Sequence, residues 1–129
     1  QGRPPTTLAK WFDMLDLQSR AMRAWDAALS ESYDVVLAPV FGTTAFPIDD
    51  NGIGNRALHI NGQAEPCASQ LAWAGLATYP GLPAVSFPAG KGNNLLPIGL
   101  QLIGRRFADR EILRVAAYLA GGADRSPGH

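Results

Sequence analysis

Apolar residues recur at helical spacing near the start of the chain, while charged and polar residues fall largely off that stripe. The pattern predicts an amphipathic helix of about five to six turns. Thr6 or Thr7 can cap its start, because a threonine hydroxyl accepts a hydrogen bond from a free amide of the first turn. Trp11 and Trp25 lie on the stripe and are expected in the core. The stripe comprises Leu8, Trp11, Phe12, Leu15, Met22, Trp25 and Leu29.

Three short apolar runs further along the chain predict β-strands. Residues 35–38 form a continuous Val-Val-Leu-Ala run, which is typical of a strand buried on both faces in a sheet covered by helices. The runs at 84–87 and 98–103 have prolines at their ends, where a missing backbone donor does not interrupt a ladder. We expect the strands at 35–38 and 84–87 to be parallel neighbours, and the strand at 98–103 to run antiparallel to 84–87.

The segments around these strands contain turn and capping signals. Asn61-Gly62, within residues 56–65, indicates a hairpin, and residues 67–78 are rich in alanine and leucine, which favours a short helix. Asp109 is expected to cap a last helix that Gly121-Gly122 ends. The order helix, strand, helix, strand, strand, helix predicts an α/β fold, a mixed sheet covered by helices with at least one antiparallel strand.

Composition and charge argue against several classes of partner. Eleven basic residues balance eleven acidic ones among 129, whereas phosphate binding needs a basic excess or a clustered basic face. We therefore expect no nucleic-acid partner. No run of about 18 apolar residues occurs, so no membrane span is expected. The single cysteine, Cys67, cannot form an intramolecular disulfide, and a cytoplasmic location is the expectation.

Few side chains suited to catalysis occur in the chain. The histidines are His59 and His129, and no serine lies in a Gly-x-Ser-x-Gly context. A Cys67–His59 pair is conceivable, but a small buried cysteine is the favoured interpretation. Metal ligation needs three or four converging His, Cys or carboxylate groups, which the spacing does not offer. We therefore expect no catalytic residue, no metal site and no cofactor in this chain.

Three segments in register resemble the amidase-signature hydrolases. Residues 33–47 read YDVVLAPVFGTTAFP and resemble that family's "-DvllTPt-p-pA-p" stretch. Residues 81–90 read GLPAVSFPAG and resemble its "GlPaisvPaG". Residues 96–120 read LPIGLQLIGRRFADREILRVAAYLA and resemble its "lPvGvQligrpf-de-lL-vA-lE". The resemblance covers about Leu8 to Ala120, nearly the whole chain.

The resemblance implies amide hydrolysis by acyl transfer, with a Ser-cis-Ser-Lys triad in a glycine- and serine-rich signature. In the family these residues lie upstream of the region matched here, and Lys10 and Lys91 match no catalytic position. The resemblance thus assigns residues 7–120 to the C-terminal portion of an amidase-signature domain, between a flexible segment (1–6) and a disordered tail (121–129). The N-terminal catalytic portion of the same fold is the implied partner, and we expect the chain alone to be inactive.

The resemblance also suggests which residues contact a small-molecule amide substrate. The candidates are Phe41, Thr43, Leu71 and Trp73. Family members that use glutamine carry an aspartate at the position of Leu71, where it holds the substrate amine. An apolar side chain cannot pair with an ammonium group, and leaving that charge unpaired is costly. If Leu71 lines the pocket, the departure implies a small, uncharged or apolar amide.

Two other interpretations remain open at the level of the sequence. The chain could be a binding or structural module that kept the fold without the chemistry, as a homo-oligomer or as one subunit of a split enzyme. It could also be an independent serine or cysteine hydrolase that uses His59. A fragment is expected to expose sheet edges and an apolar patch, whereas an evolved module is expected to cover them.

Overall fold

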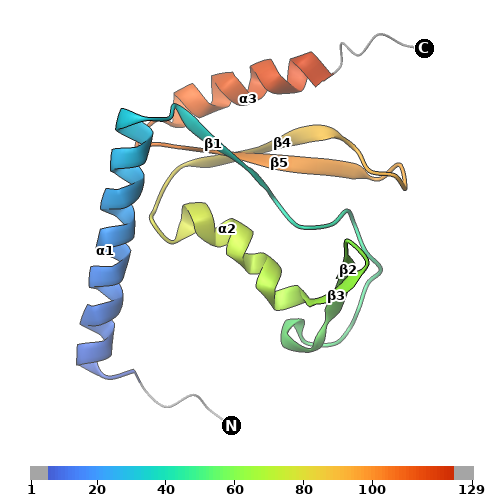
Figure 1. Ribbon diagram of the computed structural model, residues 1–129, viewed down its shortest axis with the longest axis horizontal. Helices are drawn as coiled ribbons and strands as arrows, with labels where there is room; N and C mark the ends of the chain where they lie inside the picture. The colour runs from blue at the N-terminus through green and yellow to red at the C-terminus, as the bar shows by residue number, and fades with distance from the viewer. Residues whose placement is uncertain (1–5, 124–129) are drawn as a thin grey trace.

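A three-stranded sheet with helices on both faces organises the chain (Figure 1). The structure, a computed structural model, describes residues 6–123. The described part matches the expected α/β class. The helices are α1 (Leu8–Glu31), α2 (Leu71–Thr78) and α3 (Asp109–Ala123), with short 3-10 helices η1 (Ile53–Asn55) and η2 (Cys67–Gln70). The strands are β1 (Val35–Pro39), β2 (Ala57–Ile60), β3 (Gln63–Pro66), β4 (Ala84–Lys91) and β5 (Pro97–Gly104).

β5 lies at the centre of the main sheet, between β1 and β4, and runs antiparallel to both. The predicted antiparallel pairing of β4 with β5 is confirmed. The expectation that β1 and β4 are neighbours is wrong, although both run in the same direction. Ile103 of β5 has Val36 on one side and Ala84 on the other. The short turn after β4 places β5 beside it, and β5 contributes the most deeply buried apolar residues of the sheet, so it occupies the centre.

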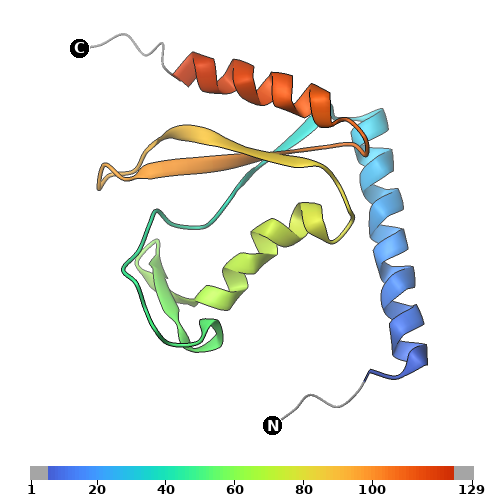
Figure 2. The same cartoon turned by 180° about the vertical axis from the view of Figure 1, so that it is seen from behind.

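The three helices are distributed over the two faces and one end of the sheet. Figure 2 shows α3 on one face, α2 on the other, and α1 running past one end. The core on the α2 face contains Leu29, Ala77, Leu82 and Ile103, and Trp25 packs against it, as expected for this residue. This core therefore joins the C-terminal half of α1 to α2 and to the central strand.

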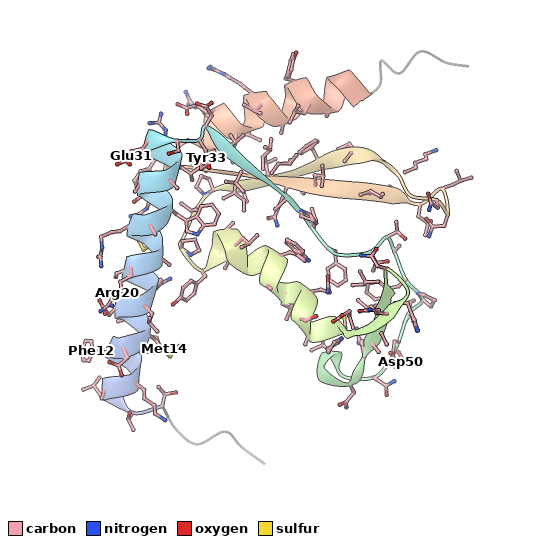
Figure 3. All side chains as sticks on the ribbon, in the orientation of Figure 1. Phe12, Met14, Arg20, Glu31, Tyr33 and Asp50 are labelled. Atoms are coloured by element: carbon pink, nitrogen blue, oxygen red, sulfur yellow. The ribbon has the colours of Figure 1, made fainter. Side chains whose placement is uncertain are left out.

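The N-terminal half of α1 extends beyond the rest of the molecule. Trp11 is 52% exposed, so its predicted place in a core is not realised in this chain. Figure 3 shows Phe12 on the side of α1 that faces away from the sheet. Thr7 caps the helix, since its hydroxyl accepts a hydrogen bond from the amide of Lys10 at 3.3 Å. Helix formation here follows the predicted pattern, but nothing within the described residues buries the apolar side chains of the first turns.

α3 covers the opposite face of the sheet, where it packs closely against β4 and also contacts β5. Ile112 and Ala116 of this helix are buried. Gly104 permits this approach, because a Cβ atom at that position would overlap Cγ2 of Ile112. Asp109 is the first residue of the helix and not its predicted cap, because the carbonyl of Ala108 accepts from the amide of Ile112 at 3.1 Å. The helix also continues through Gly121-Gly122, where it was expected to end, to Ala123. The flexible segment expected at 1–6 and the tail expected at 121–129 lie mostly outside the described residues.

Coverage of β1 is incomplete on the face that carries α3. Leu37 is 53% exposed on that face, so the expectation that this strand is buried on both sides is wrong for the described chain. Ala38, on the other face, is buried. The reason is that α3 packs over β4 and β5, and no further element of the described part covers the β1 side.

The β2–β3 hairpin and the short helix before α2 complete the fold. Asn61 and Gly62 both have positive φ, of 53° and 80°, as a two-residue type I′ hairpin turn requires, so the predicted hairpin is confirmed. The helix expected over residues 67–78 divides into η2 and α2, and Cys67 is buried, as expected of a small apolar side chain. Among residues 6–123, no helix is long and apolar enough to cross a membrane.

Candidate functional site

A pocket of about 890 Å³ opens between the loop that follows β1, the β2–β3 hairpin, and the adjacent ends of β4 and β5. Loop residues 40–45 form one wall and hairpin residues 59–61 form another. Residues 86–88 and 97–99 supply the strand side, with the turn residues 93–94 at the rim. Segments that are distant in sequence thus converge on a concave site of the size that small-molecule ligands occupy.

The structure brings two of the four predicted substrate-contacting residues into this pocket. Phe41 and Thr43 line it, and the ring of Phe41 stacks on that of Phe46 at a centroid distance of 5.7 Å. Leu71 and Trp73 lie on α2, outside the pocket wall. Leu71 is 54% exposed, whereas Trp73 is half-buried. The apolar side of the pocket is therefore supplied by the loop after β1 rather than by α2.

Gln70 holds the pocket loop against the start of α2. Its Oε1 atom accepts a hydrogen bond from the backbone amide of Gly42 at 3.0 Å and another from Nε1 of Trp73 at 3.2 Å. Trp73 thus supports the site indirectly, by orienting the glutamine that fixes the loop. A Cβ atom at position 42 would overlap the Gln70 oxygen, so only glycine permits this close approach.

Gln101 makes a second connection, from the central strand to α2 and β1. Its amide nitrogen donates to the carbonyl of Pro39 at 2.8 Å and to the carbonyl of Trp73 at 2.9 Å. The side chain is buried, where satisfied hydrogen bonds stabilise and an unpaired amide would be costly. The two glutamines, Gln70 and Gln101, therefore fix both ends of the segment that leads into the pocket.

The rim of the pocket is held by the turn between β4 and β5. Nδ2 of Asn94 donates to the hydroxyl of Thr44 at 3.0 Å, and Oδ1 of the same asparagine accepts from the amide of Leu96 at 3.2 Å. The bond between Asn94 and Thr44 joins the loop after β1 to the turn between β4 and β5. The loop is thereby fixed on two sides, as a site that must present Phe41 and Thr43 in one geometry requires.

The pocket lining combines apolar side chains with uncharged polar ones. Hydroxyl and amide side chains occur beside apolar ones, and no Asp, Glu, Lys or Arg is among the lining residues. His59 is the one lining residue with an ionisable side chain. The polar lining residues are Thr43, Thr44, His59, Asn61, Ser86, Asn93 and Asn94. Such a lining can hydrogen-bond a neutral polar group but offers no fixed charge to an ionic ligand.

The other chemical expectations concern metals and the histidine–cysteine pair. Within residues 6–123, no three His, Cys, Asp or Glu side chains gather to hold a metal ion. His59 lines the pocket, while Cys67 is buried and is not part of its wall. The geometry therefore does not join these two residues in one site.

Sequence reasoning missed the residues that position the loop. Gln101 lies within the resemblance segment 96–120, and a glutamine in the middle of an otherwise apolar strand was an available signal. A polar amide there must find partners when the strand is buried. Gln70 and Asn94 gave no comparable signal, because neither lies within an apolar strand.

Comparison with known proteins gives consistent matches. The family model described as Amidase matches residues 6–113. A glutamyl-tRNA(Gln) amidotransferase subunit of Bartonella henselae is 36% identical over 117 residues, which cover 82% of this chain and 21% of that protein. The corresponding protein of Brevibacillus brevis is 39% identical over 84 residues, which cover 65% of this chain and 15% of that protein.

Solved structures agree with the sequence matches. The crystal structure of the corresponding glutamyl-tRNA(Gln) amidotransferase subunit from Thermotoga maritima has 33% identity and a TM-score of 0.64, covering 84% of this chain and 21% of that one. A bacterial aryl acylamidase of the amidase-signature family has 25% identity and a TM-score of 0.63, covering 91% of this chain and 23% of that one. The chain spans about a fifth of the length of these relatives. From the sequence matches and the shared fold together, the chain belongs to the amidase family.

Proposed function

We propose that this chain supplies scaffold and part of the substrate pocket of an amidase that hydrolyses a small, uncharged or apolar amide. The observation that carries the proposal is the pocket lining, which contains no Asp, Glu, Lys or Arg. A substrate with an ammonium or carboxylate group would lose water there without gaining a charged partner, and that desolvation is costly. A neutral amide can instead use the ring of Phe41 and the hydroxyl of Thr43.

One comparison also supports an aryl amide as the substrate class. A bacterial aryl acylamidase of the amidase-signature family is among the similar solved structures. Leu71 lies outside the pocket wall, so the absence of an aspartate at that position carries no weight in the proposal.

The catalytic groups are proposed to come from the N-terminal portion of the same fold. Lys10 and Lys91 are exposed and lie outside the pocket lining, so neither serves there as the triad lysine. We expect the purified chain to give no amide hydrolysis above buffer, measured with a chromogenic aryl amide. A turnover that is abolished by Ser86→Ala or His59→Ala would contradict this part of the proposal.

Substrate preference can be measured in a chimera. The chain replaces the matched segment of the Thermotoga maritima amidotransferase subunit, and kcat/KM is compared for an uncharged aryl amide and for glutamine. We expect the chimera to prefer the uncharged amide. Thr43→Asp places a carboxylate in the pocket. It is expected to raise kcat/KM for glutamine relative to that for the aryl amide by about tenfold, which corresponds to roughly 1.4 kcal/mol.

A conservative variant provides the control for that shift. Thr43→Ser keeps the hydroxyl and is expected to leave the ratio of the two kcat/KM values nearly unchanged. A chimera that prefers glutamine without any introduced carboxylate would show that the proposed substrate class is wrong.

A further inference from the structure

The loop after β1 carries two aromatic rings that lie outside the buried core. Phe41 and Phe46 stack on each other, with ring centroids 5.7 Å apart and ring planes inclined by 27°. Phe46 is 41% exposed, and neither ring belongs to the core cluster around Ile103. Aromatic rings stabilise a fold by burying their large apolar area, which this pair does only in part. Core packing therefore does not account for the stacked pair.

The two rings line different hollows. Phe41 lines the pocket of about 890 Å³, and Phe46 does not. Phe46 instead lines a smaller hollow of about 230 Å³, together with the buried Leu58 of the β2–β3 hairpin. The stacked pair is thus a partition between the two hollows, with Phe46 behind Phe41 as seen from the larger one. Phe46 covers one face of the Phe41 ring and leaves the remainder of that ring to the pocket.

The backbone next to Phe41 is held by two side chains from other elements. The amide of Gly42 donates to Oε1 of Gln70 at 3.0 Å. The hydroxyl of Thr44 accepts from Nδ2 of Asn94, also at 3.0 Å. A ring that is fixed before a ligand arrives loses little conformational entropy when the ligand binds. The loop therefore presents a flat, preorganised apolar surface to the pocket.

The surroundings of this surface favour a neutral ring over a charged group. Pro88, Pro97 and Ile98 add apolar lining from β4 and β5, and no Asp or Glu lines the pocket to pair with a cation. Aromatic rings attract each other in offset or edge-to-face arrangements through their quadrupoles. A saturated ring of the same size gains no such attraction. The exposed part of Phe41 is therefore suited to an aromatic group.

We propose that Phe41 is a platform on which an aromatic ring of the substrate stacks, and that Phe46 is the positioning residue that holds this platform. The inference rests on the proposed function and narrows it, because it selects amides with an aromatic ring from the wider class of uncharged amides. The ring can belong to the acyl part or to the amine part of the amide. Two pairs of probes distinguish these cases.

Binding to the intact 129-residue chain tests the platform without requiring catalysis. Benzamide and cyclohexanecarboxamide test an aromatic acyl group, and acetanilide and N-cyclohexylacetamide test an aromatic amine. Each pair shares its size and its neutral amide and differs in aromaticity. NMR titration gives the Kd of each probe from the amide shifts of Gly42 and Thr43. In at least one pair, we expect the aromatic probe to bind about three- to tenfold more tightly than the saturated one.

Substitutions of the two rings separate contact from support. Phe41→Leu removes the platform, so the ratio of the two Kd values should fall to about one. Phe46→Leu should lower the ratio by roughly half, because the unsupported Phe41 ring becomes more mobile, and Phe46→Tyr should restore it. A merely structural role would weaken both probes equally and leave the ratio unchanged.

Phe107→Leu is the matched control. It removes an exposed ring that lies outside the pocket lining, so it should change neither Kd. Circular dichroism of each variant verifies that the fold is retained.

Several outcomes would overturn the inference. One is equal binding of the aromatic and saturated probes in both pairs, and another is the absence of binding by all four. A preference that survives Phe41→Leu, or that only Phe87→Leu abolishes, would place the aromatic contact elsewhere in the pocket. Tetramethylammonium that binds more tightly than either aromatic probe would show that the ring recognises a cation.

The chimera distinguishes failure of this inference from failure of the proposed function. A chimera that prefers glutamine, while the ratio of Kd values still depends on Phe41, would reject the proposed function and leave the platform standing. A chimera that hydrolyses aromatic and saturated amides with equal kcat/KM would reject the platform and leave the proposed function standing.

Discussion

The hydrogen bond between Gly42 and Gln70 is one of the contacts that hold the pocket loop in position. The amide of Gly42 reaches Oε1 of Gln70 because no Cβ stands between them. Phe41 and Thr43 flank this glycine, so the orientation of both pocket residues depends on that contact. Gly42 is therefore a loop position where a side chain would disturb the pocket.

Gly42→Ala should destabilise the protein and loosen the loop. The added methyl group displaces the Gln70 oxygen and removes its bond to the backbone, at an expected cost of about 1–2 kcal/mol in the free energy of unfolding. Urea denaturation measures the change. Gly54→Ala is the control, since a Cβ there meets nothing within 4 Å. Equal stability of the two variants would show that the Gln70 contact does not matter.

Phe107 illustrates a residue whose backbone conformation disagrees with its type. Its φ is +64°, in the left-handed region that residues other than glycine rarely adopt, and its side chain is 88% exposed. The ring contributes a contact with the Arg106 guanidinium at 5.4 Å, which stabilises little at an exposed site.

Phe107→Gly is accordingly expected to stabilise the chain, by about 0.5–1 kcal/mol, because glycine adopts positive φ without strain. Phe107→Ala removes the same ring but keeps a β-carbon, so it should bring no such gain. Thermal unfolding of the two variants side by side measures the difference. If alanine and glycine give the same Tm, the backbone strain is absent.

At the scale of elements, the docking of α3 onto the sheet depends on the space above β5. Gly104 ends β5, and Ile112 and Ala108 lie directly over it. Both residues are buried, so neither can move aside into solvent. The helix and strand are therefore held at a separation that a larger residue would not allow.

Gly104→Ala should cost roughly 1–3 kcal/mol in the free energy of unfolding, because overpacking forces α3 outward. Gly99→Ala, on the same strand, is the matched control, since its Cβ would make only ordinary contacts of 3.6 and 3.7 Å. Combining Gly104→Ala with Ile112→Ala should cost less than the sum of the single changes. Strict additivity in that double-mutant cycle would argue against a direct clash.

At the scale of the whole molecule, the distribution of exposed apolar residues separates two regions. The C-terminal half of α1 joins the core through Trp25 and Leu29, whereas the first turns of the same helix are exposed on all sides. The large apolar residues exposed in these first turns of α1 are Leu8, Trp11, Phe12, Met14, Leu15 and Leu17. Exposed apolar side chains that gather on one element favour association with another surface.

The isolated chain should therefore associate or bind a hydrophobic dye. We expect ANS fluorescence and a solution mass above that of the monomer, and both should fall in a Trp11→Lys, Leu15→Lys double variant. Tyr118→Lys, at an exposed position of α3, should change neither. A monodisperse monomer with cooperative unfolding and no dye binding would instead favour a self-contained binding module.

Local structure followed from the sequence to a large extent. Two predicted features depend on residues close to one another in the chain. They are the helical period of the first segment and the Asn61-Gly62 turn. The family resemblance likewise rested on short motifs, and the comparisons confirm it. These features are encoded locally because turn conformation, capping and periodicity involve neighbours within a few residues.

The tertiary structure decided the order of the strands and the contents of the pocket. β5 pairs with both β1 and β4 and therefore lies between them. No pattern within one segment of the sequence specifies which strands pair. Gln101 reaches a carbonyl 62 residues away, and Gln70 an amide 28 residues away. Trp11 was expected in a core on periodicity alone, yet a stripe specifies only which face is apolar. Whether anything covers that face depends on what the rest of the fold places against it.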